Sequence, residues 1–156
     1  MVLGAALGSG IFTFLYGEGF SYFSKDPAAC VNCHIMQPQY DSWQKSSHHS
    51  AAVCVDCHLP HSFFPKWVAK AENGFRHSKG FTFLDFPEPI FIGRKNRTVL
   101  QENCLNCHAE LVQHITGYNS GVSDCLHCHQ GAGHGEYAGL GKFTIEAEFI
   151  NPGEMR

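Results

Sequence analysis

The N-terminal end of the chain carries its longest apolar stretch. Residues 2–23 contain one charged side chain, that of Glu18. As one continuous helix this stretch would be about 33 Å long, which is enough to cross a hydrocarbon layer of about 30 Å. No basic segment precedes it and no small-residue cleavage site follows it, which disfavours a cleaved signal peptide. The pattern predicts a transmembrane signal-anchor helix over residues 1–23.

Polar positions in the middle of the chain repeat with helical spacing. A serine followed by Pro65 is typical of a helix start, and Gly80 is typical of a helix end. Lys70 and His77 then share one face, together with other polar side chains. The spacing predicts a basic helix over residues 65–79. On its own, such a helix equally fits a basic stripe that rests on anionic lipid headgroups.

Outside these two segments the pattern predicts little regular structure. The run of Phe and Pro over residues 81–92 predicts a loop. Apolar and polar residues alternate over residues 143–149, which predicts one short strand that needs a partner to be stable. The fold class we expect is mainly α, with one N-terminal transmembrane helix and a small domain of short helices and long irregular loops.

Composition narrows the class of protein. The chain has 156 residues, of which 44% are hydrophobic and 16% are charged, whereas roughly 25% charged residues are usual in soluble domains. A net charge of -3 offers no basic surface for a nucleic acid. These values exclude a disordered chain, a coiled coil and a nucleic-acid binder. The unusual counts are eight Cys and eleven His.

All eight cysteines occur in four copies of the pattern Cys-x-x-Cys-His. The copies are Cys30-Val-Asn-Cys33-His34, Cys54-Val-Asp-Cys57-His58, Cys104-Leu-Asn-Cys107-His108 and Cys125-Leu-His-Cys128-His129. This pattern is the attachment signature of c-type haem, in which two thiols bond the porphyrin and the following His lies at the iron. Disulfides, zinc sites or thioredoxin-like pairs would not require a His after every second Cys. The sequence predicts four covalently attached haem c groups.

The spacing of the motifs predicts the domain organisation. The first two motifs lie close together, as do the last two, and a long segment separates these pairs. We expect a tetrahaem domain over residues 24–135, made of two dihaem halves, and a C-terminal tail over residues 136–156 that is available for contact with a partner. In so short a chain the haems would supply much of the apolar interior.

Four six-coordinate irons need eight axial ligands, and the motif histidines supply at most four. The other candidate ligands are His48, His49, His61, His77, His114, His127, His134 and Met36. His127 lies between the two thiols of its own motif, where the geometry disfavours ligation. Met36 follows His34 by two residues, which span at most about 7 Å and cannot reach the opposite face of the same haem. Met36 is therefore either a packing residue or a replacement for His34.

These features together resemble the NapC/NirT family of membrane quinol dehydrogenases. The likeness rests on the apolar N-terminus, on the paired motifs and on a first motif that reads Cys30-Val-Asn-Cys33-His34-Ile-Met36, and it covers about residues 1–135. The short length resembles the branch that acts as the small subunit of cytochrome c nitrite reductase. The resemblance implies a single-pass protein of the bacterial cytoplasmic membrane, whose periplasmic haem domain oxidises menaquinol and reduces a periplasmic multihaem nitrite reductase subunit.

The resemblance also implies axial ligands. Met36, not His34, would ligate haem 1. The remaining implied ligands are imidazoles, in the pairs His108–His134 and His129–His49 and with His58 on haem 2. The sixth ligand of haem 2 would come from the partner subunit.

The quinol site is implied in the same way. Lys70 and the residue seven positions later would border the quinol, and that residue is an Asp in one branch but His77 here. His77 would therefore be a haem ligand or a proton acceptor, for which its near-neutral pKa is suited. Two alternatives stay open: a quinol dehydrogenase that serves a nitrate or trimethylamine oxide reductase, and a tethered tetrahaem carrier without quinol chemistry. The anchor and Met36 favour quinol oxidation.

Overall fold

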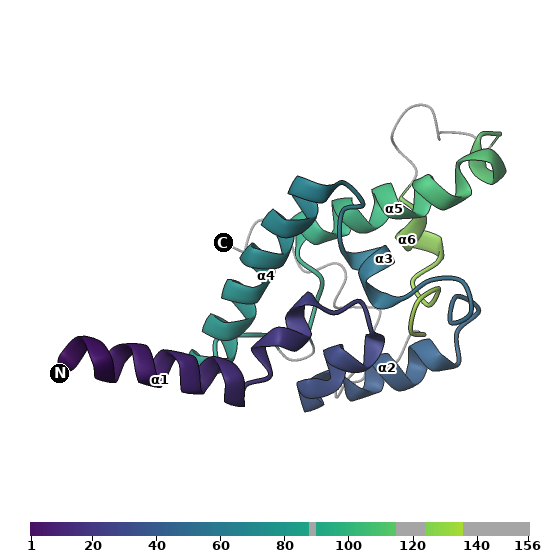
Figure 1. Ribbon diagram of the computed structural model, residues 1–156. Helices are drawn as coiled ribbons and strands as arrows, with labels where there is room; N and C mark the ends of the chain where they lie inside the picture. The colour runs from purple at the N-terminus through teal and green to yellow at the C-terminus, as the bar shows by residue number, and fades with distance from the viewer. Residues whose placement is uncertain (88–89, 115–123, 136–156) are drawn as a thin grey trace.

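The computed structural model describes residues 1–87, 90–114 and 124–135 (Figure 1). Every regular element in these ranges is a helix, which confirms the prediction of a mainly helical fold. The expected strand over residues 143–149 and the tail over residues 136–156 lie outside the described residues. In chain order the elements are α1 (Val2–Tyr16), η1 (Gly19–Phe23), η2 (Pro27–Asn32), η3 (His34–Met36), α2 (Gln37–Gln44), α3 (Cys54–His58), α4 (Phe63–Phe83), α5 (Arg94–Val112) and α6 (Cys125–Cys128).

The apolar N-terminal stretch forms two helices instead of the single one that we expected over residues 1–23. Glu18 adopts a left-handed backbone with φ 54°, which ends α1 and turns the chain into the 3-10 helix η1. Gly19 permits this turn, because a Cβ there would lie 2.4 Å from the Phe14 ring. With 15 residues, α1 is about 22 Å long. None of the described helices meets the length and hydropathy that a membrane span requires.

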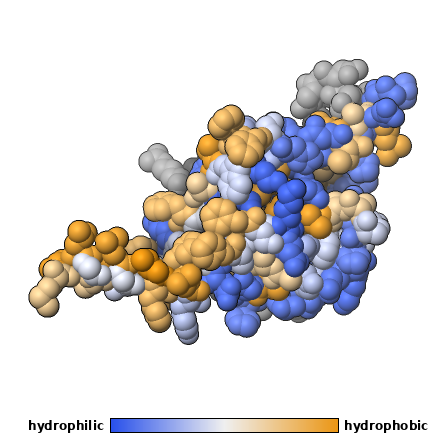
Figure 2. Space-filling model, viewed as in Figure 1, coloured by the Kyte–Doolittle hydropathy of each residue, from blue (hydrophilic) through white to orange (hydrophobic). Residues whose placement is uncertain are grey.

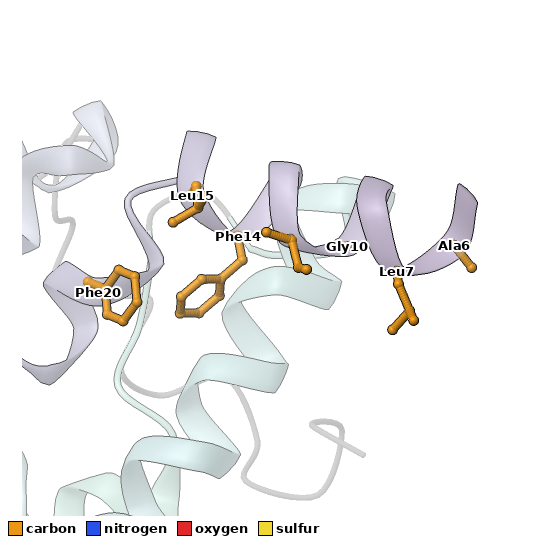
Figure 3. A pocket seen from close by; sticks show the side chains of 7 residues that line it. Ala6, Leu7, Gly10, Phe14, Leu15 and Phe20 are labelled. Atoms are coloured by element: carbon orange, nitrogen blue, oxygen red, sulfur yellow. The ribbon is translucent and has the colours of Figure 1, made fainter. Parts of the chain in front are cut away.

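An open apolar pocket runs along α1 and reaches η1, which continues the chain beyond the end of that helix (Figure 3). The rings of Phe14 and Phe20 meet edge to face, with centroids 5.1 Å apart (Figure 3). The cavity has a volume of about 450 Å³. Its lining includes Ala6, Leu7, Gly10, Phe14, Leu15 and Phe20. This end of the molecule therefore presents an apolar surface in addition to the exposed sides of α1.

The predicted helix over residues 65–79 is present as α4 but extends further at both ends. Ser62 is the residue before its first turn, as the sequence indicated, and Leu84 ends it in a left-handed conformation with φ 54°. The helix continues through Gly80, since one glycine in a helix interior costs only about 1 kcal/mol. The predicted stop at Gly80 is therefore wrong, and residues 81–83 of the expected loop are helical.

Helices α3 and α5 pack against each other in the centre of the domain (Figure 1). The buried amide of Asn103 on α5 donates to the carbonyl oxygens of Cys57, at 2.8 Å, and Leu59, at 2.9 Å. These bonds fix the segment after α3 against α5. The whole chain exposes 12160 Å², compared with about 7,800 Å² for a compact monomer of this mass. The polypeptide alone thus encloses only a small core.

Candidate functional site

Local helical structure brings the reactive side chains of each motif together. In α3, Cys54 and Cys57 lie at positions i and i+3, with His58 directly after them. Side chains at this spacing share one face of a helix, so both thiols can reach one flat group while the imidazole lies beside it. Helix α6 presents Cys125 and Cys128 in the same way. All eight thiols are unbridged, as attachment to haem requires.

The four motifs are neighbours in the order of the sequence. The thiols of Cys30 and Cys54 hydrogen-bond to each other, which lowers the pKa of Cys30 and raises that of Cys54. Cys57 lies within electrostatic reach of Cys107, and Cys104 lies within reach of Cys125. Helix α3 also contacts α5, and α5 contacts α6, so the second, third and fourth motifs lie next to one another in turn. Groups attached to the motifs would therefore follow one another in a single line.

Two pairs of imidazoles face each other across this row. The His58 and His134 rings lie 6.0 Å apart, centroid to centroid, with planes 6° apart. The His48 and His108 rings lie 6.1 Å apart at 76°. Metal–nitrogen bonds of about 2 Å on both sides of one iron would hold two ring centroids roughly 6 Å apart. Both pairs therefore have the separation of axial ligands on a shared haem iron.

The surroundings of these imidazoles favour the neutral form that binds a metal. Burial and the neighbouring His134 lower the pKa of His58 to about 4, and burial also lowers the pKa of His134. The Nδ1 atom of His48 lies 3.0 Å from the carbonyl oxygen of Ala132. Because that oxygen can only accept, Nδ1 donates and Nε2 is left for a metal. His61 uses its Nε2 to donate to the carbonyl of Asp56, at 3.0 Å, and so braces the second motif.

The predicted partners of these ligands differ from the observed neighbours. His134 lies beside His58, not beside His108, and the residue that faces His108 is His48. The ring of His49 packs against Trp43 instead, 4.8 Å away. Sequence reasoning kept both His48 and His49 as candidate ligands but could not tell them apart, because their spacings to each motif differ by one residue only. Their contacts in the folded chain distinguish them: His48 bonds to the distant Ala132 carbonyl, whereas His49 packs on Trp43.

Two motif histidines have no such mate. In the part of the chain that the structure describes, no imidazole ring contacts that of His129, which follows α6. His34 and Met36 both lie in the 3-10 helix η3 directly after the first pair of cysteines. The structure thus keeps both of these candidates beside the first motif, as the sequence required.

Lys70 is a buried cation on the inner face of α4. Only 6% of its surface is exposed. Its Nζ donates to the carbonyl oxygens of Tyr22, at 2.7 Å, and Ser24, at 3.4 Å, and lies 5.4 Å from the centroid of the Trp67 ring. Burial lowers the pKa of Lys70, and the ammonium in turn helps to lower the pKa of the Cys30 thiol. Lys70 is therefore brought beside the first motif.

His77 lies on the same side of α4 as Lys70, two turns further on. The rise between them along the axis is about 10 Å. Burial, together with the charge of Arg76, lowers the pKa of His77 below its ordinary value. The imidazole is therefore neutral near pH 7 and able to accept a proton. The predicted pairing of these two residues on one helix face is consistent with α4.

Comparisons with known proteins identify the family of this chain. Residues 1–86 match the NapC/NirT cytochrome c family, N-terminal region. The cytochrome c-type protein NrfH of Wolinella succinogenes is 37% identical over 149 residues, which cover 86% of this chain and 84% of that protein. A chain in the crystal structure of the cytochrome c nitrite reductase NrfHA complex bound to the HQNO inhibitor shares the fold, with a TM-score of 0.66 and 23% identity. That match covers 88% of this chain and 92% of the other.

Proposed function

This chain belongs to the NapC/NirT cytochrome c family, and we propose that it is a membrane-anchored tetrahaem cytochrome that oxidises menaquinol and reduces a periplasmic nitrite reductase. The observation that carries the proposal is the single row of four motifs, which begins at Cys30 beside the buried Lys70. A substrate held near Lys70 lies at one end of this row, and a partner at the other end would receive the electrons. The similarity of this chain to NrfH, and to a chain in a nitrite reductase complex, supports a nitrite reductase as the partner.

The eight thiols would hold four haem c groups, which supply one-electron redox chemistry when bound. The observed ring pairs support His58 with His134 and His48 with His108 as axial ligands, in place of the pairs that we expected from the sequence. His129 would then be the motif histidine that needs an outside mate. We place the ligand from the partner subunit at the fourth motif instead of the second, which is also where electrons would leave the chain.

Membrane attachment would come from α1 and the apolar helix η1. The segment before Glu18 has no charged side chain, and its large apolar residues are exposed, for example Leu7, Ile11 and Phe12. So much exposed apolar surface is stabilised by lipid and not by water. The haem domain would then lie on the periplasmic side, where the family's reductases reside.

The chain's own residues would position the quinol and remove its protons. An ammonium has three donors, of which Lys70 uses two on the carbonyls of Tyr22 and Ser24. The third is available for a quinol oxygen. Oxidation of a quinol releases two protons with its two electrons, so a proton acceptor must lie nearby. His77 is neutral and lies on the same face of α4, which suits it for this role.

The proposed partner can be tested with the reduced protein. The chain, in lipid nanodiscs and reduced by a menaquinol analogue, is mixed with a purified multihaem nitrite reductase, and the haem absorbance is followed. Nitrite should reoxidise the haems only when the reductase is present. The same assay is repeated with a nitrate or trimethylamine oxide reductase and its substrate. Reoxidation only in one of these mixtures would identify that reductase as the partner instead.

A further inference from the structure

The outer face of α4 carries a stripe of apolar side chains that no described residue covers. Phe64, Val68, Ala71 and Phe75 follow one another at positions i, i+4, i+7 and i+11, which places them on one side of the helix. Phe64 is 79% exposed, Val68 is 63% exposed and Phe75 is 70% exposed. A helix on the surface of a soluble domain normally turns such a stripe towards its core. Here the stripe points away from the domain.

The opposite face of α4 is the one that packs against the domain. Ala69 and Lys70 are buried there. A Cβ on Gly74 would lie 3.3 Å from the Tyr22 ring, so the glycine allows η1 to approach the helix closely. The inner face is therefore already occupied, and the helix cannot turn its outer stripe inwards without losing these contacts.

Aromatic side chains extend the stripe towards the N-terminal segment. The Trp67 ring contacts that of Phe63 at the start of α4, and it contacts that of Phe23 at the end of η1, 5.7 Å away. Phe63 is 68% exposed and Phe23 is 58% exposed. The apolar surface is thus continuous from α4 to the segment that leads into α1. Figure 2 shows hydrophobic residues gathered on the side of the domain from which α1 projects.

We infer that the outer face of α4 lies in the headgroup layer of the membrane that α1 enters. The inference rests on the proposed membrane anchor. In Figure 1, α1 projects from the domain and α4 lies on that same side. Exposed aromatic and aliphatic side chains, flanked by cations, are the composition of interfacial helices.

The charges of α4 favour lipid over a protein partner. The helix has four basic residues and a single acidic one, Glu72, whose carboxylate is paired with Lys95 on α5. Lys79 pairs with Asp85, 3.6 Å away, but 55% of its side chain stays exposed, and Arg76 is exposed on the same helix, so both cations can face anionic headgroups. Each such cation adds to the attraction towards an anionic membrane surface. This contact would hold Lys70 and His77 at the depth where quinol headgroups lie.

Photo-cross-linking of the holoprotein tests this placement. Phe64 or Phe75 is replaced by benzoylphenylalanine, which keeps an aromatic ring at the site and inserts into nearby C–H bonds under light. The full chain is reconstituted in nanodiscs of phosphatidylethanolamine and phosphatidylglycerol, and adducts are identified by intact mass. The matched control is the same probe at Leu111, which is 75% exposed on α5 at the other end of the domain.

The expected result is a phospholipid adduct at Phe64 and Phe75 that is at least tenfold more abundant than at Leu111. Adducts with a partner protein or with a second copy of the chain at these positions would overturn the inference, as would a yield no higher than at Leu111. A probe at Leu7 on α1 tests the anchor separately. Lipid adducts at Leu7 without any on α4 reject only the interfacial helix, whereas none at either place rejects the anchor itself.

Discussion

The imidazole rings of His58 and His134 lie parallel, with centroids 6.0 Å apart and planes within 6° of each other. His58 belongs to the second motif, whereas His134 follows the fourth motif. The pair therefore joins the middle of the chain to the last described segment. Because the axial ligands of an iron set its spin state and potential, the proposed ligation of one iron by both rings would make the haem of the second motif depend on the segment after the fourth.

Replacing His134 should therefore change the haem of the second motif. We expect His134→Ala to convert one low-spin haem to the high-spin form, since alanine offers no ligand. Low-temperature EPR and near-infrared magnetic circular dichroism of the purified protein measure the change. The control is His127→Ala, which alters an imidazole that lies between two motif thiols. A second replacement, His58→Met, should perturb the same signal as His134→Ala; two distinct signals would contradict the pairing.

Adjacent histidines should differ sharply in effect. His48→Ala should yield one high-spin haem, because His48 faces His108 and holds its Nδ1 on the Ala132 carbonyl. His49→Ala should leave all haem signals in place, because that ring packs against Trp43. Low-temperature EPR of both variants shows which of the two histidines ligates a haem iron. A high-spin haem in His49→Ala alone would restore the pairing expected from the sequence.

The buried amide of Asn103 should stabilise the domain without touching a haem iron. Asn103→Ala leaves the carbonyls of Cys57 and Leu59 without donors, so we expect a loss of about 1–3 kcal/mol in the free energy of unfolding. Denaturant titration of the holoprotein, followed by haem absorbance, measures it. Asn106→Ala, at an exposed position one turn further along α5, is the control and should change stability by less than about 0.5 kcal/mol. Equal losses in both variants would contradict the role of Asn103.

Proton transfer to His77 should appear in the pH dependence of quinol oxidation. Burial lowers the pKa of His77 below the ordinary histidine value of about 6.5. The imidazole is therefore protonated, and lost as a proton acceptor, only at a pH below that ordinary value. The rate should therefore be flat near pH 7 and fall on the acid side. His77→Ala should slow oxidation by about 10²-fold and abolish the acid limb. The control is His114→Ala; an unchanged pH profile in His77→Ala would exclude this role.

Local patterns predicted the parts of the structure that depend on neighbours in sequence. The four motifs and the helix around Lys70 follow from spacing alone, since side chains at i, i+3 and i+4 share a face. The break after Tyr16 was missed because apolar composition does not reveal the left-handed turn at Glu18 or the packing of Phe14 on Gly19. From the sequence, Glu18 is a single charge that a continuous apolar helix could contain.

Pairings between distant segments could not be predicted from spacing. The choice between His48 and His49 depends on a hydrogen bond to Ala132, and the mate of His58 depends on how the chain returns after α6. The outward stripe of α4 had a visible period, but the sequence alone does not show which face packs inwards. That was settled by Lys70, a charged residue buried where an apolar one is usual.

The most direct test of the proposed function is anaerobic reduction of the haems by quinol. The protein in nanodiscs is mixed with a menaquinol analogue, and the ferrous haem bands are followed by stopped-flow absorbance, with dithionite as the reference for full reduction. The wild-type protein and Lys66→Met should be reduced by the quinol, whereas Lys70→Met should be reduced normally by dithionite but at least tenfold more slowly by the quinol. If the wild-type haems respond to dithionite alone, the chain is not a quinol dehydrogenase.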